Sequence, residues 1–256
     1  MLSTATFFAR PLAATLALAA ECGYTGVEVM VTRDPASQDP IEMRRLADQH
    51  GLWIGAIHAP ALLVTRSVWG TDPVGKIDTA TRVAGDAGVP LVVMHPPYRW
   101  QASYRRWLHE DLATVEARTG VTVAIENMFP VHIGSHPLMF HANQDLEALA
   151  GIPHLVLDTS HTAVARHDLV EVRRLFGDRL RHIHLSDNAG KGWDSHLPPG
   201  EGVLDLDRFL ADVADSAFAG CVSLEVDLRK RTKDSQALRA LLIDMRERAE
   251  SALGKE

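Results

Sequence analysis

The sequence predicts one (β/α)₈ barrel that spans residues 1–256. Short apolar segments alternate eight times with amphipathic helical patterns, and no Pro-, Gly- or Ser-rich linker divides the chain. Two small domains or an open doubly wound sheet are the alternatives at this length. A G-x-G-x-x-G motif after a strand, which would favour dinucleotide binding on such a sheet, is absent. Regular alternation over 256 residues therefore favours the barrel.

Eight segments are predicted as strands because they are nearly continuous apolar runs, which is typical of strands buried on both faces of a parallel sheet. They cover residues 4–9, 26–31, 52–59, 90–96, 121–127, 154–160, 180–186 and 221–227. Helices are predicted between them. Residues 10–23 and 40–51 end at a glycine, as helices often do, and the second of these has a proline near its start. The segments with apolar side chains at helical spacing are residues 168–178, 205–216 and 235–253.

Composition and charge argue against some classes of partner. The chain is 46% hydrophobic and 23% charged, which is ordinary for a globular protein, and its formal net charge is −7 at pH 7. Because proteins that bind a DNA backbone usually carry a basic surface, the negative charge argues against a nucleic-acid partner. No apolar run is long enough to span a membrane. The two cysteines, Cys22 and Cys221, are predicted as buried small side chains, as is usual for a cytoplasmic protein. The sequence does not decide whether the protein forms a homo-oligomer.

Polar side chains gather at the carboxyl ends of the predicted strands. They are Glu28, His58, His95, Glu126, Asp158, His184 and Glu225, with His161 just beyond the sixth strand. In a barrel these ends converge on one face, where active sites are built. His182 has the same side-chain parity as His184, and we favour His184 because it is nearer the strand end.

Each of these residues also has a purely structural interpretation. The imidazoles could be satisfied in the core, Asp158 could cap a helix, and Glu28 could form a local salt bridge. Burying them together without a partner would cost several kcal/mol, and a divalent cation would remove that cost. The mixed oxygen and nitrogen set suits Mn²⁺, Mg²⁺, Co²⁺ or Zn²⁺, and more imidazoles favour Zn²⁺ or Fe²⁺. The histidines expected in solvent are His50, His109, His141, His154 and His167.

At these residues the chain resembles the xylose-isomerase-like TIM-barrel superfamily, which includes sugar phosphate isomerases and epimerases and endonuclease IV. The resemblance extends from "GYTGVEV" to "LEVD". The keto-sugar epimerase branch implies one divalent metal held by Glu126, Asp158, His184 and Glu225. It also implies that Glu126 and Glu225 move the proton on either face of the substrate carbon.

The endonuclease IV branch implies a larger set of nine ligands for three zinc ions. Their counterparts here are His58 in "HAP", His95 in "HPP", Glu126 in "IEN", Asp158 and His161 in "DTSH", His184 in "HLSD", Asp194 and His196 in "WDSH", and Glu225 in "LEV". The stretch "WDSHLPPGEG" then resembles a loop that closes the metal site. Two prolines restrict its backbone and two glycines permit turns. We expect His196 to point into the barrel mouth with Asp194 close to it.

Two enzymatic functions follow from the resemblance. The first is a metal-dependent isomerase, epimerase or related lyase that acts on a sugar or sugar phosphate through an enediolate, with Glu126 and Glu225 as the acid/base pair and His196 as a further catalytic candidate. The alternative is an AP endonuclease, a zinc-dependent phosphodiester hydrolase. The nine residues favour it, whereas the acidic charge and the absence of an aromatic-rich pattern after His58 disfavour it. A binding module without catalysis is the least favoured. Three loop residues near the expected mouth could contact a polar or phosphorylated ligand or could simply be solvated, namely Arg99, Trp100 and Lys191.

Overall fold

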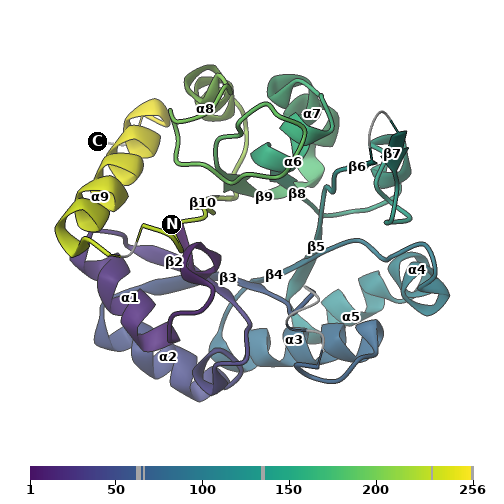
Figure 1. Ribbon diagram of the computed structural model, residues 1–256. Coiled ribbons are helices and arrows are strands. Elements are labelled where there is room, and N and C mark those ends of the chain that lie inside the picture. Colours follow the sequence, from purple (N-terminus) through teal and green to yellow (C-terminus); the bar gives the residue numbers. More distant parts are fainter. Residues whose placement is uncertain (62–64, 66, 134–135, 232, 255–256) are drawn as a thin grey trace.

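The computed structural model describes residues 1–61, 65, 67–133, 136–231 and 233–254. Parallel strands close into a barrel at its centre, and helices form a ring around them (Figure 1). Around the barrel the strands follow the order β1 (Leu2–Ser3), β10 (Cys221–Leu224), β9 (Leu180–Leu185), β8 (Leu155–Asp158), β5 (Thr122–Glu126), β4 (Leu91–Met94), β3 (Trp53–His58) and β2 (Gly26–Met30). The predicted (β/α)₈ barrel is confirmed.

The first strand differs from the prediction for residues 4–9. The barrel is closed by β1, where Leu2 pairs with both Val27 and Leu224. Residues Thr4–Phe7 form the 3₁₀ helix η1 instead, because the Ser3 hydroxyl accepts a hydrogen bond from the Ala5 amide at 3.3 Å and caps its start. An apolar run alone does not distinguish a short strand from such a turn.

The helices outside the barrel begin mostly at aspartates. Side chains of Asp39, Asp72, Asp158, Asp168 and Asp234 accept amide hydrogen bonds at helix starts. The helices are α1 (Leu12–Glu21), α2 (Pro40–Gln49), α3 (Pro73–Ala87), α4 (Ala102–Glu110), α5 (Leu112–Thr119), α6 (Thr159–Val164), α7 (Leu169–Phe176), α8 (Leu206–Ala214) and α9 (Ser235–Ala252). Further 3₁₀ helices are η2 (Pro35–Ser37), η4 (Glu147–Leu149) and η5 (Gly177–Arg179). The ring closes where α9 lies between α8 and α1 (Figure 1). Among the described helices, none is both long and apolar enough to cross a membrane.

An antiparallel ribbon that the sequence did not predict follows β5. It consists of β6 (Val131–Ile133) and β7 (His136–Leu138), and it lies outside the strand ring (Figure 1). Three residues on each strand carry too little alternation to be recognised as strands from sequence. The ribbon and the loop after it flank the carboxyl end of β5, where Glu126 is located.

The core lies mainly between the barrel and the helices. Fully buried large side chains there include Leu16 of α1, Ile57 of β3 and Ile77 of α3. Of the two cysteines, Cys22 is buried as expected, whereas Cys221 is only half-buried at the start of β10.

Candidate active site

The barrel interior is built in layers, because side chains two residues apart on a strand face the same way. The lower layer is a small apolar cluster that includes Ala56, Val93, Ala124 and Val156. Two positions further along the same strands, at or just beyond their carboxyl ends, are His58, His95, Glu126 and Asp158. The change from apolar to polar side chains therefore coincides with the end of the barrel at which active sites form.

Four side chains converge on one point at this end. Glu126, Asp158, His184 and Glu225 each offer one nitrogen or oxygen atom, and these atoms all lie within 4.8 Å of one another. His184 Nδ1 lies 2.8 Å from Glu225 Oε2, 3.1 Å from Glu126 Oε1 and 3.8 Å from Asp158 Oδ2. The structure thus brings together the four residues that the resemblance to keto-sugar epimerases implies around one ion.

The charges of this cluster depend on one another. Burial opposes ionisation of Glu126, but His184 and His161 outweigh it and hold the pKa of Glu126 well below its ordinary value. Burial also opposes the charge of His184, and Glu225 and the other carboxylates nevertheless raise the pKa of His184 well above its ordinary value. For Asp158 burial prevails and raises the pKa. Several buried carboxylates are therefore held close together beside His184, an arrangement that needs positive charge.

Two buried carboxylate oxygens remain without a hydrogen bond. Within the described part of the chain, Glu126 Oε2 and Asp158 Oδ2 have no hydrogen-bond partner. His95 Nε2 lies 3.2 Å and His58 Nε2 lies 3.6 Å from Glu126 Oε2, close enough for an ion pair. Buried acceptors normally have a hydrogen-bond partner. Two buried oxygens without one therefore have a lone pair available to coordinate a cation.

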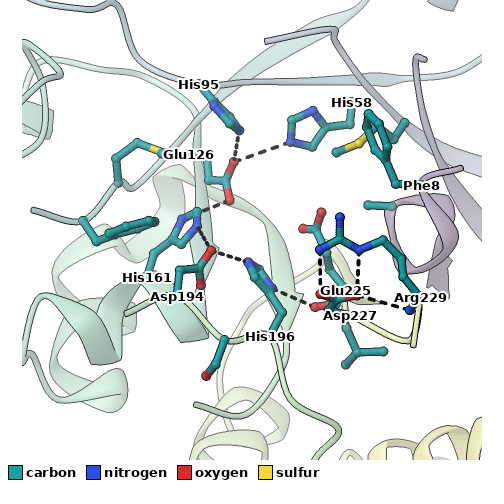
Figure 2. A pocket seen from close by; sticks show the side chains of 16 residues that line it. Phe8, His58, His95, Glu126, His161, Asp194, His196, Glu225, Asp227 and Arg229 are labelled. Carbon is teal, nitrogen blue, oxygen red and sulfur yellow. Dashed lines mark hydrogen bonds and ion pairs between the residues drawn. The ribbon is translucent and has the colours of Figure 1, made fainter. Parts of the chain in front are cut away.

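A second cluster lies beside the first and includes the loop residues. Asp158, His161 and His196 also offer ligand atoms within 4.8 Å of one another. Asp194 Oδ2 lies 2.9 Å from His196 Nε2 and 3.4 Å from His161 Nε2. As expected, His196 points into the cavity and Asp194 lies next to it (Figure 2).

A cavity of about 410 Å³ opens onto both clusters, a volume typical of small-molecule sites. Glu126 and Glu225 line it, whereas Asp158 and His184 are completely buried. Apolar side chains also line it, namely Phe8, Met30, Met128 and Phe129. The two glutamates are therefore the members of the four-residue cluster that can reach a ligand directly.

Comparison with known proteins gives the family. A sequence profile described as xylose isomerase-like TIM barrel matches residues 16–244. The chain belongs to the xylose isomerase-like TIM-barrel family. An uncharacterized protein of Mycobacterium leprae is 36% identical over 244 residues, which cover 88% of this chain and 87% of the relative. Fructoselysine 3-epimerase of Escherichia coli O157:H7 is 27% identical over 120 residues, covering 45% of this chain and 42% of that enzyme.

Among solved structures, D-psicose 3-epimerase from Clostridium cellulolyticum H10 matches with a TM-score of 0.75 over 98% of each chain. Its sequence is 15% identical to this chain, so the match shows the fold of the family.

In this family member, Glu28 and His182 support the site from below. Glu28 is completely buried, and its Oε2 lies 2.6 Å from His182 Nε2. Both Glu28 oxygens lie 3.1 Å from His184 Nε2. The sequence allowed a local salt bridge for Glu28, and the structure shows ion pairs with two histidines that are distant along the chain. The role of His182 was not predicted, because His182 and Glu28 are 154 positions apart.

Asp187 was also missed, and it organises the loop that carries His196. Its buried carboxylate accepts hydrogen bonds from the amides of Gly200 at 3.0 Å, Gly202 at 2.9 Å and Leu204 at 3.0 Å. The backbones of Asp187 and Leu197 also pair in both directions. An aspartate between a strand and a glycine-rich loop was the available signal, since such side chains bind turn amides.

Several expectations about single residues need correction. His141 was expected in solvent but is buried, because its Nδ1 bonds to the Pro96 carbonyl oxygen at 2.8 Å. His50 and His154 are half-buried, whereas the histidines exposed as expected are His109 and His167. Of the three loop residues for which ligand contact and solvation were both open, Trp100 lines a neighbouring cavity, and Arg99 and Lys191 are exposed. Instead, Arg229 lines the main cavity, where Asp227 pairs with it at 2.6 Å (Figure 2).

Proposed function

We propose that this protein is a divalent-metal-dependent epimerase or isomerase of a keto sugar or its phosphate, with a related lyase reaction as a variant of the same chemistry. The observation that carries the proposal is the convergence of Glu126, Asp158, His184 and Glu225 within 4.8 Å at the carboxyl end of the barrel. The names of two similar proteins, fructoselysine 3-epimerase and D-psicose 3-epimerase, support epimerisation as the reaction.

The donor set fits a divalent cation. Three carboxylates and one imidazole surround the point, and Asp158 Oδ2 and Glu126 Oε2 have no hydrogen bond within the described residues. Such a set suits Mn²⁺, Mg²⁺, Co²⁺, Zn²⁺ or Fe²⁺. When bound, the ion would supply a Lewis acid that polarises the oxygens of the substrate.

The two cavity-lining glutamates have the placement that proton transfer needs. Glu126 ends β5 and Glu225 directly follows β10, and β8 and β9 separate these strands around the barrel. They therefore approach the ligand from different sides. One carboxylate would take a proton from the carbon beside the carbonyl, and the other, protonated, would return one to the opposite face. One proton leaves and one arrives, so the configuration of that carbon inverts.

Exchange with solvent tests this assignment. Protein purified without chelator is incubated in D₂O with D-fructose, D-psicose, D-tagatose and L-ribulose, and NMR follows each carbon. We expect the epimer of at least one sugar to form, with deuterium at the inverted carbon. Glu126→Gln and Glu225→Gln should each abolish this exchange. Exchange that continues at the wild-type rate in both variants would contradict the assignment.

A second candidate function is a zinc-dependent phosphodiester hydrolase of the endonuclease IV kind. The second cluster of Asp158, His161 and His196 favours it, because it offers donors for further ions. The net charge of −7 argues against it, and so does the pairing of Arg229 in the cavity with Asp227. We therefore expect weak affinity for abasic duplex DNA by fluorescence anisotropy at about physiological salt. Submicromolar binding with metal-dependent incision would reverse this ranking.

His196→Ala distinguishes one ion from several. If the second cluster holds an ion, the variant loses metal stoichiometry. If only one ion is bound, His196 instead contacts substrate or carries a proton, and turnover falls at unchanged stoichiometry. A variant that changes neither, with saturating metal and a true substrate, would show that the loop takes no part in the chemistry.

A further inference from the structure

A second cavity of about 510 Å³ lies beside the one described above, and His95 forms part of the wall of both. Its volume is again in the range of small-molecule sites. His95 Nε2 lies 3.2 Å from Glu126 Oε2, so a single imidazole ring separates the second cavity from that carboxylate. A ligand that fills the first cavity beside Glu126 would therefore need a further group to reach past His95 into the second cavity.

The wall of the second cavity contains a rigid aromatic surface. The rings of Tyr98 and Trp100 are parallel within 2°, with centroids 4.7 Å apart, and Tyr98 also stacks on buried His141 at 4.4 Å. Trp100 is nevertheless 68% exposed. The Arg99 amide bonds to the Phe140 carbonyl at 2.9 Å, which holds this segment against the next loop. An indole supported in this way is preorganised, since little freedom is lost when a ring stacks on it.

The described residues that line this cavity include one lysine, and its ammonium group is bonded to the protein itself. No carboxylate occurs among the described residues that line it. Its lysine, Lys76, is 7% exposed and donates to the carbonyl oxygens of Pro60 at 2.7 Å and Thr65 at 3.3 Å. The ammonium group is thus engaged by the protein itself. Met94, Pro96 and Trp100 supply apolar surface, and Gln101 supplies an amide.

We propose that the second cavity binds an additional uncharged sugar ring, so that a keto sugar linked to another sugar is preferred over the free monosaccharide. This inference rests on the proposed function. The reacting keto sugar occupies the first cavity beside Glu126 and Glu225. The second ring passes His95 and lays its apolar face on the open face of Trp100, while its hydroxyl groups contact the polar side chains nearby.

Calorimetric titration of the metal-loaded protein tests the proposal with D-fructose and two disaccharides that carry a fructose unit, lactulose and isomaltulose. At least one disaccharide should bind about ten-fold more tightly than fructose, as stacking of one ring on an aromatic side chain allows. Trp100→Ala should remove this preference, and Trp100→Phe should retain part of it. Trp193→Ala, which removes another exposed tryptophan of this end of the barrel, should leave the preference intact.

Several results would overturn the proposal. One is equal affinity of the protein for fructose and both disaccharides. Absence of binding of all three sugars up to their solubility limit counts as the same result. Another is loss of the preference in Trp193→Ala but not in Trp100→Ala. A third is tighter binding of D-fructose 6-phosphate than of either disaccharide, abolished by Lys76→Met, which would assign the cavity to an anion. Because the titration measures binding and the D₂O experiment measures exchange, a failure of the second-ring proposal can be distinguished from a failure of the proposed function.

Discussion

His184 has two ring nitrogens, and the structure gives each a different environment. Its Nε2 faces Glu28, with both carboxylate oxygens at 3.1 Å, and its Nδ1 faces Glu225 at 2.8 Å. A proton on Nε2 donated to Glu28 leaves the Nδ1 lone pair directed at the carboxylates of the cluster. A carboxylate behind a histidine fixes ring orientation and tautomer in this way at metal sites.

Glu28→Gln should weaken metal binding by about 10–100-fold, because the amide keeps the shape but no longer presents two acceptors to the imidazoles. The affinity can be measured by titration against a chelating dye. Glu116→Gln is the matched control, since Glu116 pairs with His154 at 3.3 Å away from the cluster. Equal affinities in all three proteins would show that Glu28 does not position His184.

The stability of the metal-free protein should depend on His161. Although burial opposes its charge, Asp158 and Asp194 raise the pKa of His161 from 6.5 to about 10. A raised pKa contributes stability that is complete below the ordinary value and is lost as the pH rises through the folded value. In chelator, the melting temperature should therefore fall between about pH 6.5 and pH 10. His161→Asn should make this fall smaller, while the raised pKa of His184 keeps part of it, and exposed His167→Asn should leave it unchanged; identical profiles would contradict the assignment.

The residues at strand ends could be predicted because period-two alternation and the direction of the strands place them on one face. The partners of those residues could not. Glu28 and His184 are 156 positions apart, and their contact depends on how β2 and β9 are placed across the barrel interior. Sequence parity could not distinguish His182 from His184 either; the structure shows that His182 faces Glu28 one layer below.

Among the elements, the loop of residues 187–204 is the one most closely tied to the site. It carries Asp194 and His196, and Asp187 binds its amides from inside. His196 adopts a left-handed backbone with φ +39°, which is unfavourable for a residue with a side chain. Its Nδ1 lies 2.9 Å from the Glu225 carbonyl oxygen and 3.1 Å from Ser186 Oγ. These contacts hold the ring at the cavity despite the strained backbone.

Gly202→Ala should disrupt this loop. A Cβ atom there would lie 2.2 Å from Asp187 Oδ1 and 2.3 Å from the Asn188 carbonyl oxygen, so the backbone must move. We expect a loss of about 1–3 kcal/mol in the free energy of unfolding in urea, together with reduced turnover. Gly151→Ala, where a Cβ atom meets nothing within 4 Å, is the control. Stability and turnover equal to the control would mean that the loop does not depend on this close approach.

Strands and helices of ordinary length could be predicted because their apolar patterns extend over enough residues. The strand β1 and the ribbon of β6 and β7 could not, since two or three residues show no reliable period. The role of β1 depends on long-range pairing with β2 and β10. Local hydrogen bonds at Ser3 decide where the following turn begins.

At the scale of the whole molecule, barrel closure assembles the site. Glu126, Asp158, His184 and Glu225 come from the ends of four neighbouring strands, β5, β8, β9 and β10. Pairing between adjacent strands also fixes the register. His184 of β9 pairs with Asp158 of β8 on one side and with Ser223 of β10 on the other. Sequence alone could predict this convergence because a closed barrel brings the carboxyl ends of its strands to one face. It could not predict the adjoining cavity at Trp100, which depends on how two loops pack.

The metal content of wild-type protein and Glu225→Gln tests the central claim most directly. Both are dialysed against the same free concentrations of Mn²⁺, Co²⁺ and Zn²⁺, and bound metal per chain is determined by elemental analysis. Glu201→Gln serves as the control, because Glu201 is an exposed glutamate that pairs with Arg231. We expect at least one ion per chain in the wild type and the control, and a clear loss in Glu225→Gln with the fold unchanged by circular dichroism. Equal metal content in all three proteins, or no bound metal in the wild type, would contradict the claim that these four residues hold a divalent cation.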